Sequence, residues 1–428
     1  MQRILSAHLP SHIGETVTVA GWVHRRRLLK SVAFLILRDA GGLTQVVATT
    51  DAERAVVEAL TEESVVAVTG TVVANTAAPA GVELHQPAVR GLGAPAVAPP
   101  FDLFRPALNA SLPTQLDHAS VSLRHPVRAT ALRASAAATA GFRSTLDELG
   151  FVEVHTPKIV ASATESGANV FALDYFGRTA YLAQSPQFYK QLMVGVFERV
   201  YEVGPAFRAE PHDTVRHLAE YTSLEAELGF IADHRDVMAV LREALAGMLA
   251  AVRERAGQAL DGLGVAVPTV PAQIPDVHFS EALVVAGAPL DEPDLAPAHE
   301  RTLGEWARRE HGSDFLFVTG YPMAKRPFYT HPDPARPSYS NGFDLLFRGL
   351  EVVTGGQRLY RHGDYLAALA ARAEPVEAYA SYLDAFRHGI PPHGGFAIGL
   401  ERFVARLTGA ANIREVTAFP RDLHRLSP

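Results

Sequence analysis

The sequence predicts an α+β protein with two parts, a small N-terminal β-barrel and a larger domain built on an antiparallel sheet flanked by helices. Residues 13–90 contain short segments of alternating apolar and polar residues, separated by turn signals. Residues 91–126 are rich in proline and show little periodicity. The remainder interleaves strands and helices without the regular spacing of βαβ units, which favours antiparallel pairing.

The N-terminal part is predicted to have five strands, with one helix at residues 51–60 after the third. The strands are expected at residues 16–23, 34–39, 43–47, 65–73 and 82–89. Five strands with a helix after the third are typical of an OB-fold barrel, which we place at residues 1–92. Barrels of this kind bind single-stranded nucleic acid by stacking bases and contacting their edges.

Residues 93–126 are predicted to be a hinge, and residues 127–428 a second domain. Amphipathic patterns predict helices at 128–149, 233–257 and 375–388, with a final strand running into a final helix.

Composition limits the classes of protein. A chain of 428 residues with 48% hydrophobic and 20% charged residues is ordinary for a soluble globular protein of two or three domains. There is no cysteine, which excludes disulfides, thiol catalysis and zinc–thiolate sites. The sequence has no run of 18 apolar residues and no signal-peptide pattern in its first ten residues, so a cytoplasmic protein without membrane spans is expected.

The formal net charge is −7, which argues only weakly against nucleic-acid binding because local basic patches bind phosphate whatever the total. The sequence contains only four lysines, Lys30, Lys158, Lys190 and Lys325. Almost all positive charge is therefore arginine, and each lysine stands out as a candidate functional residue.

Two arginines in separate segments suggest a nucleotide site. Arg208 and Glu210 are two apart on a predicted hairpin and face the same way. A guanidinium can bind phosphate bidentately, and a carboxylate can accept from an amino group. Near the C-terminus, Gly399 ends a predicted strand and Arg402 lies in the helix that follows. Together the segments predict a bent triphosphate held at both ends. Either arginine alone would be interpreted as part of a surface ion pair, which contributes about 0–1 kcal/mol to stability.

These segments resemble motifs 2 and 3 of class II aminoacyl-tRNA synthetases, and residues 149–157 are similar to motif 1. Over residues 126–428 the chain resembles the class IIb aspartyl-tRNA synthetases in their compact archaeal-type form. The resemblance implies a ligase that activates L-aspartate with ATP and transfers it to tRNA(Asp). It also implies a homodimer formed through motif 1, with Pro157 near the partner's site. Compact relatives in bacteria often charge tRNA(Asn) as well, for a tRNA-dependent amidotransferase.

The resemblance assigns roles around ATP. Arg208 would hold the α-phosphate and Arg402 the γ-phosphate, and these two with Glu351 form the catalytic set. Glu210 would accept from the adenine amino group, and Tyr221 would stack on adenine. The full predicted ATP set is Arg208, Ala209, Glu210, Arg216, His217, Leu218, Tyr221, Glu351, Gly399, Leu400, Glu401 and Arg402. Mg²⁺ needs hard oxygen ligands, expected from Glu351 and Thr354, with Glu227 a possible second carboxylate.

Aspartate would be recognised by cations around its side chain. Lys190 and Arg358 match the family residues that reach this carboxylate, and a neutral asparagine side chain would leave two such cations under-paired. The predicted aspartate set is Glu165, Gln187, Lys190, Arg208, Thr354 and Arg358. Glu225 stands where the family usually has Asp, and we assign it no role.

Anticodon contacts are expected on the barrel. Phe34 would stack a base and Gln45 would read an edge, as recognition of single-stranded RNA requires. Arg25, Arg26 and Arg27 would meet phosphates, and His24 with the loop at residues 75–79 would shape the pocket for the third base.

Two alternatives remain open from the sequence. An asparaginyl-tRNA synthetase shares the fold, and Lys190 with Arg358 argues against it. A catalytically silent RNA-binding paralogue would use only the barrel, and the intact set of Arg208, Glu210, Glu351, Arg358 and Arg402 argues against it.

Overall fold

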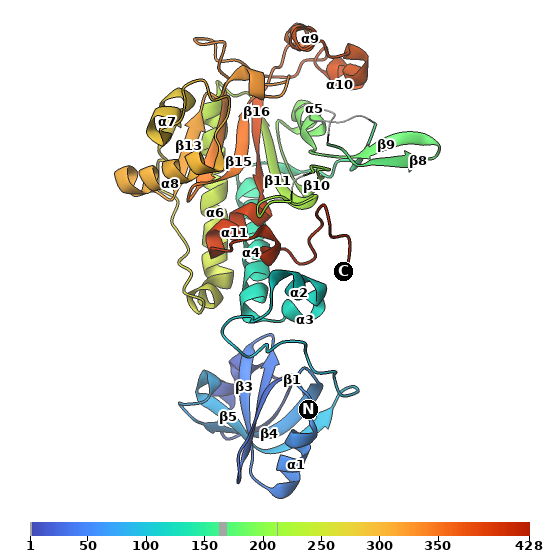
Figure 1. Cartoon of the computed structure of the whole chain (residues 1–428), viewed down its shortest axis with the longest axis vertical. Helices are drawn as coiled ribbons and strands as arrows, with labels where there is room; N and C mark the ends of the chain where they lie inside the picture. The colour runs from blue at the N-terminus through green and yellow to red at the C-terminus, as the bar shows by residue number, and fades with distance from the viewer. Residues whose placement is uncertain (1, 162–168, 212) are drawn as a thin grey trace. The chain divides into compact units, whose positions relative to one another are not determined.

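The computed structural model describes residues 2–161, 169–211 and 213–428. The chain divides into two compact units, Met1–His125 and Pro126–Pro428 (Figure 1). Within the described residues, no helix is both long enough and apolar enough to cross a membrane.

The first unit contains a closed five-stranded barrel with strand order β1-β2-β3-β5-β4. Its strands are β1 (Thr16–Leu28), β2 (Ala33–Asp39), β3 (Gly42–Ala48), β4 (Val65–Ala74) and β5 (Val82–Gly91). Alternate residues point into a core of Val, Leu and Ala side chains, as the period of two predicts. The helix α1 (Asp51–Ala59) begins at a capping box formed by Thr50 and Glu53. The predicted barrel with its helix after the third strand is confirmed.

The segment after the barrel is grouped with the first unit. It carries the short helices α2 (Leu112–Asp117) and α3 (Ala119–Ser122). Arg124 of this segment pairs with Glu63 of the barrel at 2.8 Å, and Glu63 also binds Arg38. Whether residues 93–126 act as a hinge stays a prediction.

The second unit is built on an eight-stranded sheet with order β12-β13-β14-β15-β16-β11-β10-β6. Its strands are β6 (Val152–Glu153), β10 (Arg199–Phe207), β11 (Glu220–Gly229), β12 (Asp276–His278), β13 (Phe315–Thr319), β14 (Gly342–Phe347), β15 (Leu350–Gln357) and β16 (His393–Gly399). The six central strands are antiparallel, as predicted. The two edge pairs, β6 with β10 and β12 with β13, are parallel, so the sheet is mixed with an antiparallel centre. A smaller sheet of order β7-β9-β8 comprises β7 (Ile159–Val160), β9 (Arg178–Leu182) and β8 (Ala172–Tyr175).

Two long helices, α4 (Pro126–Glu148) and α6 (His234–Asp261), pack on each other and on one face of the sheet (Figure 1). Their close approach depends on glycines, since a Cβ on Gly141 would lie 2.5 Å from the carbonyl oxygen of Gly247. The remaining α-helices are α5 (Gln187–Phe197), α7 (Phe279–Ala286), α8 (Pro297–His311), α9 (His362–Ala371), α10 (Ala380–Ala385) and α11 (Leu400–Thr408). The helix expected at 375–388 is a 3-10 turn (Val376–Tyr379) followed by the short α10.

The face of the sheet opposite α6 is the one available for a site. On β16, a Cβ at Gly394 would meet Val237 of α6, whereas a Cβ at Gly395 would lie 2.1 Å from Glu227 on the other side. The motif-bearing strands β10, β11, β16 and β15 are neighbours in the sheet, and α11 continues directly from β16. The topology therefore brings the predicted nucleotide segments together, although they are far apart in sequence.

Candidate active site

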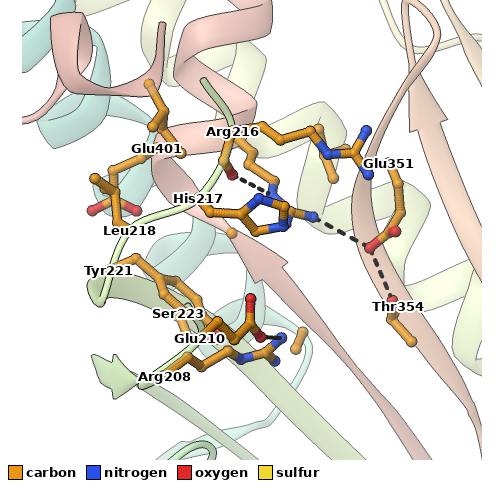
Figure 2. Close-up of a pocket in the computed structure, with 15 residues that line it drawn as sticks. Arg208, Glu210, Arg216, His217, Leu218, Tyr221, Ser223, Glu351, Thr354 and Glu401 are labelled. Atoms are coloured by element: carbon orange, nitrogen blue, oxygen red, sulfur yellow. Dashed lines mark hydrogen bonds and ion pairs between the residues drawn. The ribbon is translucent and has the colours of Figure 1, made fainter. Parts of the chain in front are cut away.

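A pocket lies over the central strands and is lined by polar side chains from β11, β15, the β10–β11 loop and α11 (Figure 2). It contains most of the predicted ATP set. The lining residues are Arg208, Glu210, Arg216, His217, Leu218, Tyr221, Ser223, Glu351, Val352, Thr354, Ala397, Gly399, Glu401, Arg402 and Ile413. Of the predicted ATP residues, Ala209 and Leu400 do not line it, and Leu400 is packed in the core instead.

One side of the pocket is formed by the hairpin. Arg208 follows β10 directly, and its guanidinium lies 3.8 Å from the carboxylate of Glu210 and 5.6 Å from the ring centroid of Tyr221. The side chain of Arg208 remains 37% exposed. A loose, partly hydrated ion pair of this kind contributes little to stability.

The other side of the pocket is formed by β15 and α11. Thr354 donates a 3.3 Å hydrogen bond from its hydroxyl to Glu351, and Arg402 Nη1 lies 3.5 Å from the same carboxylate (Figure 2). Arg402 also donates from Nε to the carbonyl oxygen of Arg216, at 3.3 Å. The carboxylate of Glu401, the neighbour of Arg402 in α11, accepts a hydrogen bond from the backbone N–H of Thr222. Burial raises the pKa of Glu401. Arg402 is thus held between the backbone of the β10–β11 loop and the carboxylate of Glu351.

The donor set on β15 fits Mg²⁺. Glu351 supplies a carboxylate and Thr354 a hydroxyl, and Mg²⁺ is usually held by one or two carboxylates together with substrate phosphates and waters. Among the described residues, no group of three or more His, Asp or Glu side chains could hold a metal ion unaided.

Beside the pocket, Lys190, Arg358 and Gln187 meet in a buried cluster. Lys190 is fully buried, and its Nζ lies 2.7 Å from the carboxylate of Glu225 and 3.5 Å from that of Glu227. Arg358 Nε donates to Glu227 at 3.0 Å, and Gln187 Nε2 donates to Glu227 at 3.3 Å. Burial by itself would raise the pKa of Glu227, but Arg358 and Lys190 outweigh it and hold this pKa below its usual value. The cluster is therefore two cations balanced by two carboxylates.

This pairing corrects the charge argument drawn from the sequence. The two cations come together as predicted, but they are not under-paired, because Glu225 and Glu227 already neutralise them. Glu227 belongs to this cluster rather than to the lining around Glu351, which disfavours it as a second metal ligand. Glu225 binds Lys190 and also accepts from Ser223, at 2.8 Å. Ser223 lines the pocket, so it connects the pocket to the buried cluster.

The predicted aspartate set is thus divided. Arg208 and Thr354 line the pocket, Gln187, Lys190 and Arg358 form the cluster, and Glu165 lies outside the described residues. Asp344 was not predicted from the sequence; it stands opposite Thr354 on β14 and pairs with Arg326 at 3.0 Å. Burial raises the pKa of Asp344 to about 6, with Arg326 opposing the shift and Glu351 adding to it. The sequence feature that could have indicated Asp344 is its position as the one charged residue in the otherwise apolar segment 343–347.

The predicted anticodon residues lie on the barrel and differ in exposure. Phe34 is half-buried on the outer side of β2 and is not part of the barrel core, with the Arg27 guanidinium 6.0 Å from its ring centroid. Gln45 donates to Glu83 at 2.8 Å, and Arg26 donates to the carbonyl oxygen of Glu58. Arg25 is exposed and its guanidinium lies 4.3 Å from the ring centroid of Phe104. Phe34 therefore lies on the outside of the barrel, whereas the side-chain amide of Gln45 is already bonded to Glu83.

His24 differs from the other predicted anticodon residues because it is buried. It occupies a bulge in β1, where the pairing with β2 shifts between Val23 and Arg25. Its Nδ1 lies 3.4 Å from Arg38 Nη1. Burial, followed by Arg38, lowers the pKa of His24 to about 4.

This pKa predicts a pH dependence of barrel stability. Between pH 6.5 and 4 the unfolded chain binds a proton at His24 that the folded barrel does not, so the free energy of unfolding should fall as pH falls through this range. We expect a loss of about 2 kcal/mol by pH 4.5 from this group, and a flatter profile for His24→Gln. Trp22 fluorescence in a Trp306→Phe background would report unfolding of the barrel. Parallel pH profiles for the two proteins would contradict this account of His24.

The protein combines a polar pocket on a mixed sheet flanked by helices with a closed five-stranded OB-fold barrel. Residues 111–423 match the family model of class II tRNA synthetases (D, K and N), and residues 17–90 match the OB-fold nucleic acid binding domain. The chain belongs to this class II tRNA synthetase family.

Similar proteins cover the whole chain. It is 44% identical to the Aspartate--tRNA(Asp/Asn) ligase of Deinococcus radiodurans, over 100% of this chain and 99% of that protein. It is also 44% identical to the protein of the same name from Thermus thermophilus, over 100% of both. Among solved structures, the asparaginyl-tRNA synthetase from Pyrococcus horikoshii complexed with asparaginyl-adenylate matches with a TM-score of 0.91 and 30% identity, over 100% of both chains.

Proposed function

We propose that this protein is an aspartate–tRNA ligase. In the first step an α-carboxylate oxygen of L-aspartate attacks the α-phosphorus of ATP, and the bond to the bridging oxygen breaks to release pyrophosphate. In the second step the terminal ribose hydroxyl of tRNA attacks the acyl carbon, and AMP leaves. The observation that carries the proposal is the polar pocket holding Arg208, Glu351 and Arg402 beside the buried Lys190–Arg358 cluster. Full-length similarity to two aspartate–tRNA ligases supports it.

The pocket residues act by positioning and by charge. Arg208 would bind the α-phosphate, where negative charge increases as the new bond forms, while Arg216 and Arg402 hold the distal phosphates. Tyr221 would offer a stacking surface for adenine, and Glu210 would accept from the adenine amino group. Mg²⁺ held by Glu351 and Thr354 would neutralise phosphate charge and align the triphosphate. No side-chain nucleophile is needed, because orientation supplies much of the rate.

Selectivity for aspartate over asparagine rests on donor geometry in this proposal. Lys190 and Arg358 present only N–H donors. An aspartate side chain offers two acceptor oxygens, whereas an asparagine amide would turn one of its own donors toward these cations. The carboxylates of Glu225 and Glu227, with Gln187, keep the cations in one geometry and leave acceptors for the substrate ammonium group. The similarity to an asparaginyl enzyme is at 30% identity, and the aspartate ligases at 44% are favoured over it.

We propose further that both tRNA(Asp) and tRNA(Asn) are substrates and that the protein is a homodimer. The relaxed tRNA range is supported by the names of the relatives, which specify Asp/Asn. On the barrel, neutral His24 and the loop at residues 75–79 would form the part that meets the third anticodon base. A protein with this range requires a tRNA-dependent amidotransferase to convert Asp-tRNA(Asn).

Aspartate charging of purified tRNA(Asp) and tRNA(Asn) transcripts tests the proposal. We expect both transcripts to be charged. Charging of tRNA(Asp) alone would remove the relaxed range and leave the ligase activity standing. Charging of neither, with intact transcripts that a control enzyme accepts, would contradict the proposal as a whole.

A further inference from the structure

Glu300 on α8 is buried at the phosphate end of the pocket although it does not line the pocket itself. It is 2% exposed, and its carboxylate accepts three contacts from the Arg216 guanidinium, at 3.0, 3.1 and 3.3 Å. It also accepts from the backbone N–H of Glu351, at 2.9 Å. One buried carboxylate thus holds a side chain of the motif 2 loop and the backbone of β15.

These contacts are part of a closed ring of four residues. Glu300 binds the Arg216 side chain and the Glu351 backbone, and Arg402 binds the Glu351 side chain and the Arg216 carbonyl oxygen. The four residues come from the β10–β11 loop, α8, β15 and α11. Three of them line the pocket, and Glu300 is the member that lies behind it. Each segment is therefore fixed to two others through this ring.

The ring matters because Arg216 lies on a loop. An arginine side chain has several rotatable bonds, and ordering it when the ligand binds costs conformational entropy. A bidentate carboxylate fixes the guanidinium in advance. This contact is made through the two Nη atoms, and a guanidinium carries five N–H donors, so Arg216 can bind Glu300 and a phosphate at the same time. The hydrogen bond to the Glu351 backbone similarly fixes the strand from which the Glu351 carboxylate projects.

We propose that Glu300 is a positioning residue that pre-arranges Arg216 and Glu351 for the distal phosphates of magnesium-bound ATP. The inference rests on the proposed function of the pocket. Glu300 touches neither nucleotide nor metal, and it acts through the cation of Arg216 and the backbone of Glu351. Its removal should weaken nucleotide binding and leave recognition of the aspartate side chain unchanged, because the hydrogen bonds of Glu300 among the described residues go to Arg216 and Glu351 and not to the buried cluster around Lys190.

The test compares Glu300→Ala and Glu300→Gln in the full chain, with Glu305→Ala as the control on the exposed side of the same helix. Calorimetry with ATP and Mg²⁺ measures nucleotide binding, and aspartate-dependent ATP–pyrophosphate exchange gives KM for each substrate. For Glu300→Ala we expect binding of magnesium-bound ATP to weaken by about tenfold or more. The KM for aspartate should stay within about twofold of wild type, because neither Arg216 nor Glu351 belongs to the buried cluster that would bind the aspartate side chain. Glu300→Gln keeps one oxygen acceptor and should recover part of the loss, and Glu305→Ala should match wild type.

A double variant separates positioning from general packing. If Glu300 acts mainly through Arg216, the effect of Glu300→Ala on ATP binding should shrink in an Arg216→Ala background. Unchanged ATP binding in Glu300→Ala would overturn the inference, and so would an equal rise in both KM values without recovery by Glu300→Gln. Wild-type protein that binds ATP but shows no aspartate-dependent exchange would contradict the proposed function instead, and the calorimetric comparison would still decide the role of Glu300.

Discussion

Arg208→Ala should reduce aspartate-dependent ATP–pyrophosphate exchange by about a thousandfold, the largest effect that we expect from one substitution. Arg208 is the cation assigned to the α-phosphate, where negative charge increases in the transition state. Its ion pair with Glu210 is long and its side chain is partly exposed, so the loss of this pair should cost little stability. Exchange with purified protein at saturating aspartate measures the effect, and thermal unfolding checks that the fold is kept.

Arg208→Lys is the matched control for this prediction. It keeps the charge and loses the planar bidentate group, so we expect it to recover only a small part of the lost rate. Exchange near the wild-type rate in Arg208→Ala would contradict the assignment of Arg208 to the α-phosphate.

The second large effect is expected from Lys190→Ala, which should raise the KM for aspartate by about a hundredfold and change the KM for ATP little. The substitution removes the fully buried ammonium that would meet the substrate carboxylate. It also leaves Glu225 and Glu227 with one cation between them. Breaking a buried pair in this way costs about 3–5 kcal/mol, so the free energy of unfolding should fall as well. Exchange kinetics and thermal unfolding report the two losses separately.

Lys325→Ala serves as the control, because Lys325 is an exposed lysine of the same unit. It should alter neither KM nor stability. An unchanged aspartate KM in a folded Lys190→Ala protein would show that the buried cluster does not recognise the substrate side chain.

Much of the fold could be predicted because its local patterns agree with its tertiary structure. Strand β2 alternates strictly between buried and partly exposed residues, and α1 carries a capping box that marks where the helix begins. The parallel edges of the large sheet could not be predicted in the same way. β6 has two residues and β12 has three, so neither is long enough to carry a readable period.

The site residues that could be predicted are those in segments that resemble the family, such as Arg208, Glu351 and Arg402. The residues missed are partners brought in by tertiary structure. Glu300 lies on an amphipathic helix between charged neighbours, and nothing in its local sequence indicates that it binds Arg216, 84 positions earlier in the chain. The two carboxylates that balance Lys190 and Arg358 stand on a strand facing the cluster, so their pairing depends on sheet order rather than on spacing in the sequence.

ATP–pyrophosphate exchange with purified wild-type protein shows whether the protein activates aspartate. The assay compares aspartate, asparagine and no amino acid, each with ATP and Mg²⁺. Our account predicts exchange with aspartate and only background exchange with asparagine. Exchange with asparagine in preference to aspartate, or with neither, would contradict it.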